Sequence, residues 1–327
     1  MSGPLLWLIG AGGFLGSHVR QTLPSHIAGA RLWVPKPERF SWSVPTQLAR
    51  EMDSAVAAFA DAVQAHKTPW GLLWCAGTGV VSSPAEVLAT EYSCWLQLLD
   101  LLGERLARPL PELPGAIFLA SSAGGVYGGN TEFLLTEGSV PRPNVAYGEH
   151  KLRMEEALIA FSGSFANVSS LIGRISSLYG TGQDLRKAQG IISHLSRAMI
   201  YRRPLNIYVS LDTRRDYLYS VDSAHKICAS FNRLMAKHPD RKIKIFAAEE
   251  LTSLAEICGI FFRIAKRHPL IVSAQPRQLT QATSLNFRSE VWRDLPDIPK
   301  TDLAIGIRLV HQYHLALFRQ GLLPAPT

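Results

Sequence analysis

Short apolar runs alternate with longer amphipathic segments along the first half of the chain. Continuous apolar runs are typical of strands that are buried on both faces of a parallel sheet. The amphipathic segments between them repeat their apolar positions with a helical period. The predicted strands are 5–10, 30–35, 71–77, 115–122 and 168–175, and the predicted helices are one that begins at GSHVRQTL and those at 52–66, 84–106 and 147–161.

This alternation predicts an α/β fold with a doubly wound parallel sheet (Rossmann) and helices on both faces. Ligands of such sheets bind at the carboxyl ends of the strands. After about residue 178 the alternation weakens, and short strands, loops and helices mix. We therefore expect 1–177 to form the Rossmann domain and 178–327 to form mainly a smaller substrate-binding lobe, with some segments returning to the first domain.

The segment GAGGFLG follows the first predicted strand and opens a helix. Glycines in this position let the backbone approach a pyrophosphate, whose charge is stabilised by the helix N-terminus. The usual G-x-G-x-x-G spacing fails at Leu15, whereas G-x-x-G-x-x-G fits Gly10, Gly13 and Gly16. The alternative interpretation is a strand–helix turn whose glycines serve close packing alone. In an alternating α/β chain the pattern favours a dinucleotide site.

The tip of the second strand bears on the choice of cofactor. NAD-binding folds place an acidic residue here for the ribose, about 20 residues after the glycines. The segment reads VPKPER, with Lys36 and Arg39 and no acid at the tip, which suits a 2′-phosphate and indicates NADP. Glu38 is still close enough for a ribose contact, and a solvated basic loop is the alternative.

Tyr147 and Lys151 stand four residues apart in a predicted helix, so they share one face of it. A phenol alone is a poor base because its pKa is about 10. A neighbouring ammonium favours the phenolate. The pair is therefore either a tuned acid–base unit or an ordinary exposed pair.

Composition and charge narrow the function. The chain has 327 residues, of which 47% are apolar and 18% charged, as in a globular enzyme. Its net charge of +8 predicts an anionic partner. Basic residues are scattered without an aromatic–basic module, which favours a phosphate-bearing small ligand over nucleic acid. We expect neither a membrane span nor a signal peptide. The cysteines are not paired in a CxxC motif, so we expect no metal and a cytoplasmic protein.

Six segments, in order, resemble the extended short-chain dehydrogenase/reductases, and more narrowly the NAD-dependent sugar-nucleotide epimerase/dehydratase family. The first three are the glycine turn, SSAGGVYG (121–128) and Tyr147-x-x-x-Lys151. The others are RISSLYGTGQ (174–183), RRDYLYSVDSA (214–224) and IPKTDLAIGIRLVHQYHLALF (298–318). The resemblance covers nearly the whole chain.

The resemblance implies a mechanism without a metal. Tyr147 would be the acid–base group, and Lys151 would lower its pKa and contact the nicotinamide ribose. Ser122 would hold the reacting oxygen, with Ser121 in reserve, because Ala123 stands where relatives have the serine or threonine. The implied cofactor (NAD or NADP) contacts are Gly10, Gly13, Phe14, Leu15, Gly16, Lys36, Arg39, Cys75, Ala76, Gly77, Tyr147 and Lys151. The implied substrate contacts are Ser122, Ser177, Lys187 and Arg215.

Departures from the family pattern limit the reaction. The acids that 4,6-dehydratases carry after the catalytic residue are Ala or Gly here, which argues against dehydration. Ser177 and Glu91 stand where relatives often have Asn. Arg215 matches an arginine near the substrate phosphates, although an ion pair with Asp216 or Asp222 is an equal alternative.

We therefore expect an NAD(P)-dependent epimerase or ketoreductase that acts on a nucleoside-diphosphate sugar. The alternatives are a reductase of a non-nucleotide ketone in secondary metabolism and a non-catalytic cofactor-binding relative. A homodimer through helices 84–106 and 147–161 is expected from the family.

Overall fold

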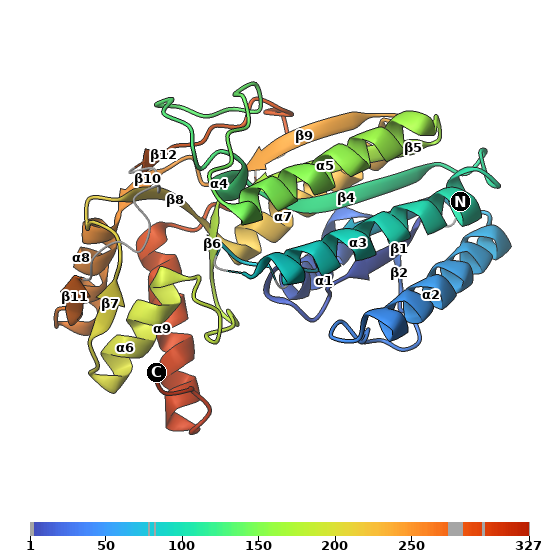
Figure 1. Ribbon diagram of the computed structural model, residues 1–327. Helices are drawn as coiled ribbons and strands as arrows, with labels where there is room; N and C mark the ends of the chain where they lie inside the picture. Colours follow the sequence, from blue (N-terminus) through green and yellow to red (C-terminus); the bar gives the residue numbers. More distant parts are fainter. Residues whose placement is uncertain (1–2, 78, 82, 274–283, 296–297, 327) are drawn as a thin grey trace.

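The computed structural model describes residues 3–326 apart from 78, 82, 274–283 and 296–297. Its largest element is a six-stranded parallel sheet with the order β2-β1-β3-β4-β5-β9 (Figure 1). These strands are β1 (Leu5–Ile9), β2 (Arg31–Trp33), β3 (Trp70–Trp74), β4 (Gly115–Ser122), β5 (Val168–Ile175) and β9 (Arg241–Phe246). The predicted doubly wound α/β fold is confirmed.

Helices cover both faces of the sheet because successive side chains of each strand point to opposite sides. Leu5, Trp7 and Ile9 of β1 pack with α2 (Pro45–His66), α3 (Ala85–Leu102) and α5 (Ala146–Ser164). Leu6 and Leu8 pack on the other side with α1 (Phe14–His26) and α7 (Ser220–Ala236). Both faces are therefore buried, which explains why the strands read as continuous apolar runs.

The edge beyond β2 departs from the common order of such sheets, 3-2-1-4-5-6, which has a further strand outside the second one. Here the chain leaves β2, forms α2 and returns as β3 on the other side of β1. The three-residue β2 is consequently the edge of the sheet.

A second group of elements lies beyond the carboxyl ends of the parallel strands (Figure 1). Its own core is formed mainly by α6, α8 and α9. A small sheet is centred on β8, which pairs with β6, β10 and β12, while β7 pairs with β11. The bounds are β6 (Ser177–Tyr179), α6 (Ile191–Tyr201), β7 (Leu205–Ile207), β8 (Arg214–Tyr219), β10 (Leu251–Ser253), α8 (Leu254–Ala265), β11 (Ile271–Ser273), β12 (Ser284–Leu285) and α9 (Leu303–Arg319).

The main sheet takes elements from both parts of the sequence, because α7 and β9 return to it after β8. The division at residue 177 stays a prediction. Several predicted boundaries were wrong by two residues or more. Strand β2 ends at Trp33 rather than at 35, and α5 ends at Ser164 rather than at 161. Helix α2 begins at Pro45 rather than at 52, since proline is tolerated in the first helical turn. Strand β3 ends at Trp74 rather than at 77, where the chain turns away through Gly77 with φ +140°.

Two short elements follow longer ones directly, one after β4 and one at the C-terminal end of α3. The short α4 (Ala123–Val126) directly follows β4, and a π-helical turn (Gly103–Ala107) extends α3. No helix in the described part of the chain is long and apolar enough to cross a membrane.

Candidate active site

The glycine turn has the geometry that a pyrophosphate requires. Gly10 has φ +88°, and a Cβ there would lie 2.5 Å from the backbone nitrogen of Ala76. A Cβ on Gly16 would overlap the carbonyl oxygen of Gly10. Gly13 is the N-cap of α1, and this helix has neither a side-chain cap nor an acidic residue in its first turn. Its first N–H groups and positive dipole end therefore remain suitable for a phosphate anion.

A cavity of about 930 Å³ lies where the carboxyl ends of the main strands meet the second group of elements. It brings together most of the residues predicted from the sequence. Its walls include Gly13, Phe14, Leu15, Cys75, Ala76, Gly77, Ser121, Ser122, Tyr147, Lys151, Ser177, Lys187 and Arg215. Gly10 and Gly16 lie behind this wall in the tight turn. Lys36 and Arg39 do not line the cavity and are exposed in the segment after β2.

The two candidate serines at the end of β4 have different partners. Ser121 is buried, and its hydroxyl donates to Oε1 of Glu155 at 2.5 Å. Ser122 caps α4, where its Oγ accepts from the backbone N–H of Gly125 at 3.1 Å. An oxygen that accepts this bond still has its own hydrogen to donate. Ser122 is thus the better donor toward a ligand in the cavity.

The glycines that follow these serines make room for the Tyr147 ring. A Cβ on Gly125 would lie 3.2 Å from two carbon atoms of that ring, and a Cβ on Gly148 would overlap the Gly125 carbonyl. On the opposite side, a Cβ on Gly79 would lie 3.7 Å from Tyr147 Cδ2. Small residues on both sides therefore fix where the phenol stands at the cavity wall.

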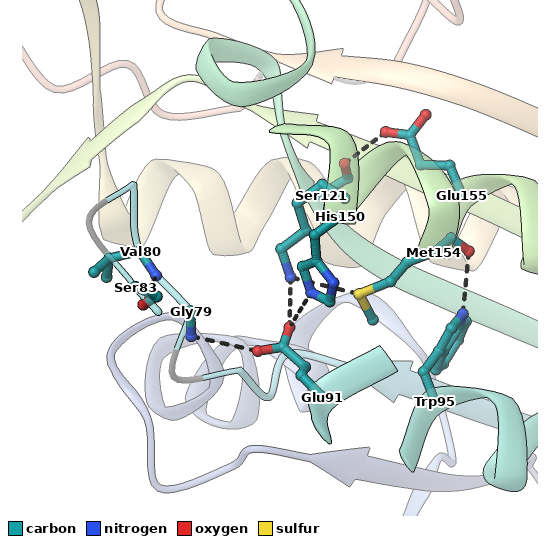
Figure 2. Close-up of polar contacts among 10 residues, drawn as sticks. Gly79, Val80, Ser83, Glu91, Trp95, Ser121, His150, Met154 and Glu155 are labelled. Atoms are coloured by element: carbon teal, nitrogen blue, oxygen red, sulfur yellow. Dashed lines mark hydrogen bonds and ion pairs between the residues drawn. The ribbon is translucent and has the colours of Figure 1, made fainter. Parts of the chain in front are cut away.

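Lys151 is held by a carboxylate from a different helix. Its Nζ lies 2.8 Å from Oε1 of Glu91 on α3, and His150 Nε2 lies 3.3 Å from the same oxygen. Figure 2 shows the Glu91 carboxylate between His150 and the backbone N–H of Gly79, which donates to Oε2 at 3.3 Å. Burial alone would raise the pKa of Glu91, but Lys151 and His150 outweigh it and lower the pKa. Glu91 is therefore a carboxylate that is ionised and almost fully buried.

A second buried ion pair fastens α5 to the sheet. Arg174 on β5 contacts both carboxylate oxygens of Glu155, with Nη2 at 2.6 Å from Oε2. Its Nη1 donates to the hydroxyl of Tyr127, which in turn donates to the carbonyl of Thr136. Because Ser121 donates to Glu155 as well, this network links the helix of Tyr147 to the strand that ends at Ser122 (Figure 2).

Arg215 lines the cavity and has no carboxylate partner among the described residues, and its Nη1 donates to the backbone carbonyl of Arg214 at 2.8 Å. Asp216 accepts from Ser176 and from the backbone N–H groups of Ala248 and Glu250, and Asp222 accepts from Thr301. The alternative of an ion pair with either aspartate therefore does not hold. Burial lowers the pKa of the Arg215 guanidinium, which nonetheless stays charged because arginine is always protonated in proteins.

Several polar residues of the cavity wall were not predicted from the sequence. They come from α6 and from the segment around β7: His194, Arg197, Asn206 and Tyr208. Arg197 gave the one available signal, because a charged residue inside the mainly apolar run IISHLSRAMI points to a special environment. The described residues contain no group of three or more potential ligands that could hold a metal.

Comparison with known proteins agrees with this architecture. The model of the NAD dependent epimerase/dehydratase family matches residues 6–245. The chain belongs to this family. The family is defined by its nicotinamide cofactor, and the glycine turn and the uncapped first turn of α1 fit such a group. NAD or NADP is therefore the cofactor class of this family member.

Individual relatives cover several reactions. A dTDP-4-dehydro-6-deoxyglucose reductase of Escherichia coli is 32% identical over 151 residues, which is 46% of either chain, so the match spans about half of that relative. The UDP-glucose 4-epimerase of Thermotoga maritima is 20% identical, with a TM-score of 0.75 over 98% of this chain and 99% of the other. RMD from Pseudomonas aeruginosa, solved with NADPH, is 21% identical, with a TM-score of 0.72 over 95% and 98%. These two structures share the fold.

Proposed function

We propose that this family member is an NADPH-dependent reductase of a nucleoside-diphosphate keto-sugar. One observation carries the proposal: a single cavity is lined by Ser122, Tyr147 and Lys151 and also by Arg215, whose guanidinium has no carboxylate partner among the described residues. The first group suits a carbonyl that gains a proton. The second suits the phosphates of a nucleotide. A ligand with both features would occupy the whole cavity.

At the reacting end, the bound nicotinamide would supply a hydride to the carbonyl carbon. Tyr147 would donate its phenolic proton to the carbonyl oxygen, so that the product is an alcohol. Ser122 would donate a hydrogen bond to the same oxygen and hold it against Tyr147. Lys151 would favour the phenolate that remains, because its ammonium lies 5.8 Å from the centre of the Tyr147 ring.

At the other end, Arg215 would grip a phosphate through two parallel N–H donors, a geometry that lysine does not offer. Lys187 lines the same cavity and would add a second positive charge. The chain's net charge of +8 would attract an anionic substrate at long range.

Two features favour reduction over the other reactions of the family. The tip of β2 is followed by exposed Lys36 and Arg39, which suit the 2′-phosphate of NADPH, a cofactor that must exchange after each reduction. Ala123 and Gly124 provide no carboxylic acid for dehydration. The Escherichia coli relative is a reductase by name, which supports the same class.

The first experiment identifies the cofactor and the direction of the reaction. The purified protein is denatured, any released nicotinamide nucleotide is identified by mass spectrometry, and the protein is then mixed with NADPH and nucleoside-diphosphate 4-keto-6-deoxy sugars. Substrate-dependent oxidation of NADPH supports the proposal. Tightly held NAD, together with interconversion of epimers and no net NADPH use, would show an epimerase instead.

Substitutions then separate the two ends of the cavity. Tyr147→Phe should abolish reduction while NADPH still binds. Arg215→Met should weaken binding of UDP or dTDP alone by about 10- to 100-fold, as expected for a hydrogen-bonded charge pair. Arg214→Met is the matched control, because this neighbouring arginine is exposed and outside the cavity wall. Equal effects of both arginine variants would remove Arg215 from the proposed substrate site.

A dimer and a cytoplasmic location remain part of this proposal. Helices α3 and α5 expose Val87, Leu96 and Ile159, which an interface between copies would cover. Sedimentation of the purified protein tests the oligomeric state.

A further inference from the structure

The partner of Lys151 is a carboxylate, in a place where water has almost no access. Lys151 is 5% exposed and Glu91 is 8% exposed. Besides Glu91 Oε1 at 2.8 Å, the ammonium contacts only the sulfur of Met154 at 3.8 Å within the described part of the chain. A thioether is a weak acceptor. Glu91 is thus the one strong acceptor that faces this ammonium among these residues.

An ammonium in such a place keeps its proton only if something compensates the lost hydration. Burial disfavours the charged form of lysine, and the pKa of a buried lysine can lie several units below its ordinary value. Here burial alone would lower the pKa of Lys151, whereas Glu91, with further contributions from Tyr147 and Glu155, raises it. The charge of Lys151 therefore depends on Glu91.

The other titratable groups near Lys151 do not replace this counter-ion. Tyr147 presents its ring, and Glu155, one turn further along α5, is already bound to Arg174. His150 shares the same Glu91 oxygen and competes for it. Cys94 of α3 lies near the carboxylate, and burial followed by the charge of Glu91 raises the pKa of its thiol to about 12, so that it stays neutral.

We propose that Glu91 is a positioning residue that keeps Lys151 protonated, so that the acid–base unit is a chain of Glu91, Lys151 and Tyr147. This inference extends the proposed function, in which Lys151 favours the tyrosinate. Glu91 comes from α3 and also accepts from Gly79 N–H in the loop after β3. It therefore ties the catalytic helix to the loop that lines the cofactor end of the cavity.

The test measures the protonation of Lys151 directly, without substrate or cofactor. Protein with ¹³C-labelled lysine is titrated by NMR, and the Lys151 signal is assigned by its absence from Lys151→Met. In the wild type this signal should titrate above the ordinary lysine value of about 10.4. In Glu91→Gln, which is isosteric and can still accept from Gly79, it should titrate at least about two pH units lower. Glu91→Asp, which keeps the charge, should stay much closer to the wild type.

Activity provides the second readout. The basic limb of the pH–rate profile of Glu91→Gln should move to lower pH along with Lys151, and turnover should recover when the pH is lowered. Unchanged Lys151 titration in Glu91→Gln would overturn the proposal. If that variant does not fold, a wild-type Lys151 that titrates below the ordinary lysine value would overturn it equally. Failure of the protein to reduce any nucleotide sugar would refute the proposed function and leave the NMR result standing.

Discussion

Replacement of Arg174 by methionine tests whether the buried pair with Glu155 holds α5 on the sheet. Arg174 is 3% exposed and Glu155 is 1% exposed. Three N–O contacts of 2.6 to 3.1 Å join them. Methionine is unbranched and carries no charge or N–H donor, so it would leave the Glu155 carboxylate buried with Ser121 as its remaining donor.

The loss of stability follows from the uncompensated charge. Breaking a buried ion pair by removing one partner costs about 3–5 kcal/mol, because the other charge stays desolvated. We therefore expect Arg174→Met to lower the free energy of unfolding by about this amount. Removing both charges should cost less, so Arg174→Met combined with Glu155→Met should be more stable than Arg174→Met alone. Urea unfolding followed by circular dichroism gives both values, provided that the slope with urea is unchanged.

The control is Arg186→Met, which breaks the exposed pair with Asp184 and should leave the unfolding midpoint where it is. A stabilising role of the buried pair is refuted if Arg174→Met costs less than about 1 kcal/mol, or if the double variant is no more stable than the single one. Either result would mean that water or a neighbouring side chain solvates the Glu155 carboxylate.

Two other predictions concern the glycine turn and the second group of elements. Gly16→Ala places a Cβ against the carbonyl of Gly10, so nicotinamide-nucleotide binding measured by calorimetry should be lost, whereas Gly12→Ala, which has open space, should keep it. His314 is fully buried, and burial lowers its pKa to about 4. Because the unfolded chain binds this proton more readily, stability should fall as the pH drops from about 6.5 to about 4, by at most about 3 kcal/mol. His314→Phe should flatten this part of the stability curve, and an unchanged slope would contradict the assignment.

The sequence predicted the main sheet well because both faces of its strands are buried. The runs 115–122 and 168–175 coincide with β4 and β5, and each consists of buried or partly buried residues throughout. The order of the strands was not predicted. Which neighbours pair depends on contacts between distant segments, such as β5 with β9, and no local pattern records them.

Hydrogen-bond partners in the structure answer two questions about the site that the sequence left open. Ser121 and Ser122 are identical residues side by side, and they are distinguished by their partners, Glu155 on α5 for Ser121 and the backbone N–H of Gly125 for Ser122. Arg215 was assigned equally to a phosphate and to two aspartates. The structure removes the ion pair because Asp216 is turned toward backbone N–H groups on another segment. Each decision depends on a contact between residues far apart in the sequence.

Helix α5 shows why the sequence predicts a helix that carries Lys151 but not the environment of that lysine. The helix buries His150, Lys151 and Glu155, so its buried face is as charged as many exposed faces. A pattern of polar positions normally marks the solvent side of a helix. Here the charges are compensated from other elements, by Glu91 on α3 and by Arg174 on β5. Ion pairs therefore hold α5 against its neighbours, in part, as apolar contacts hold α3. They also fix the position and the orientation of the part of α5 that carries Tyr147 and Lys151.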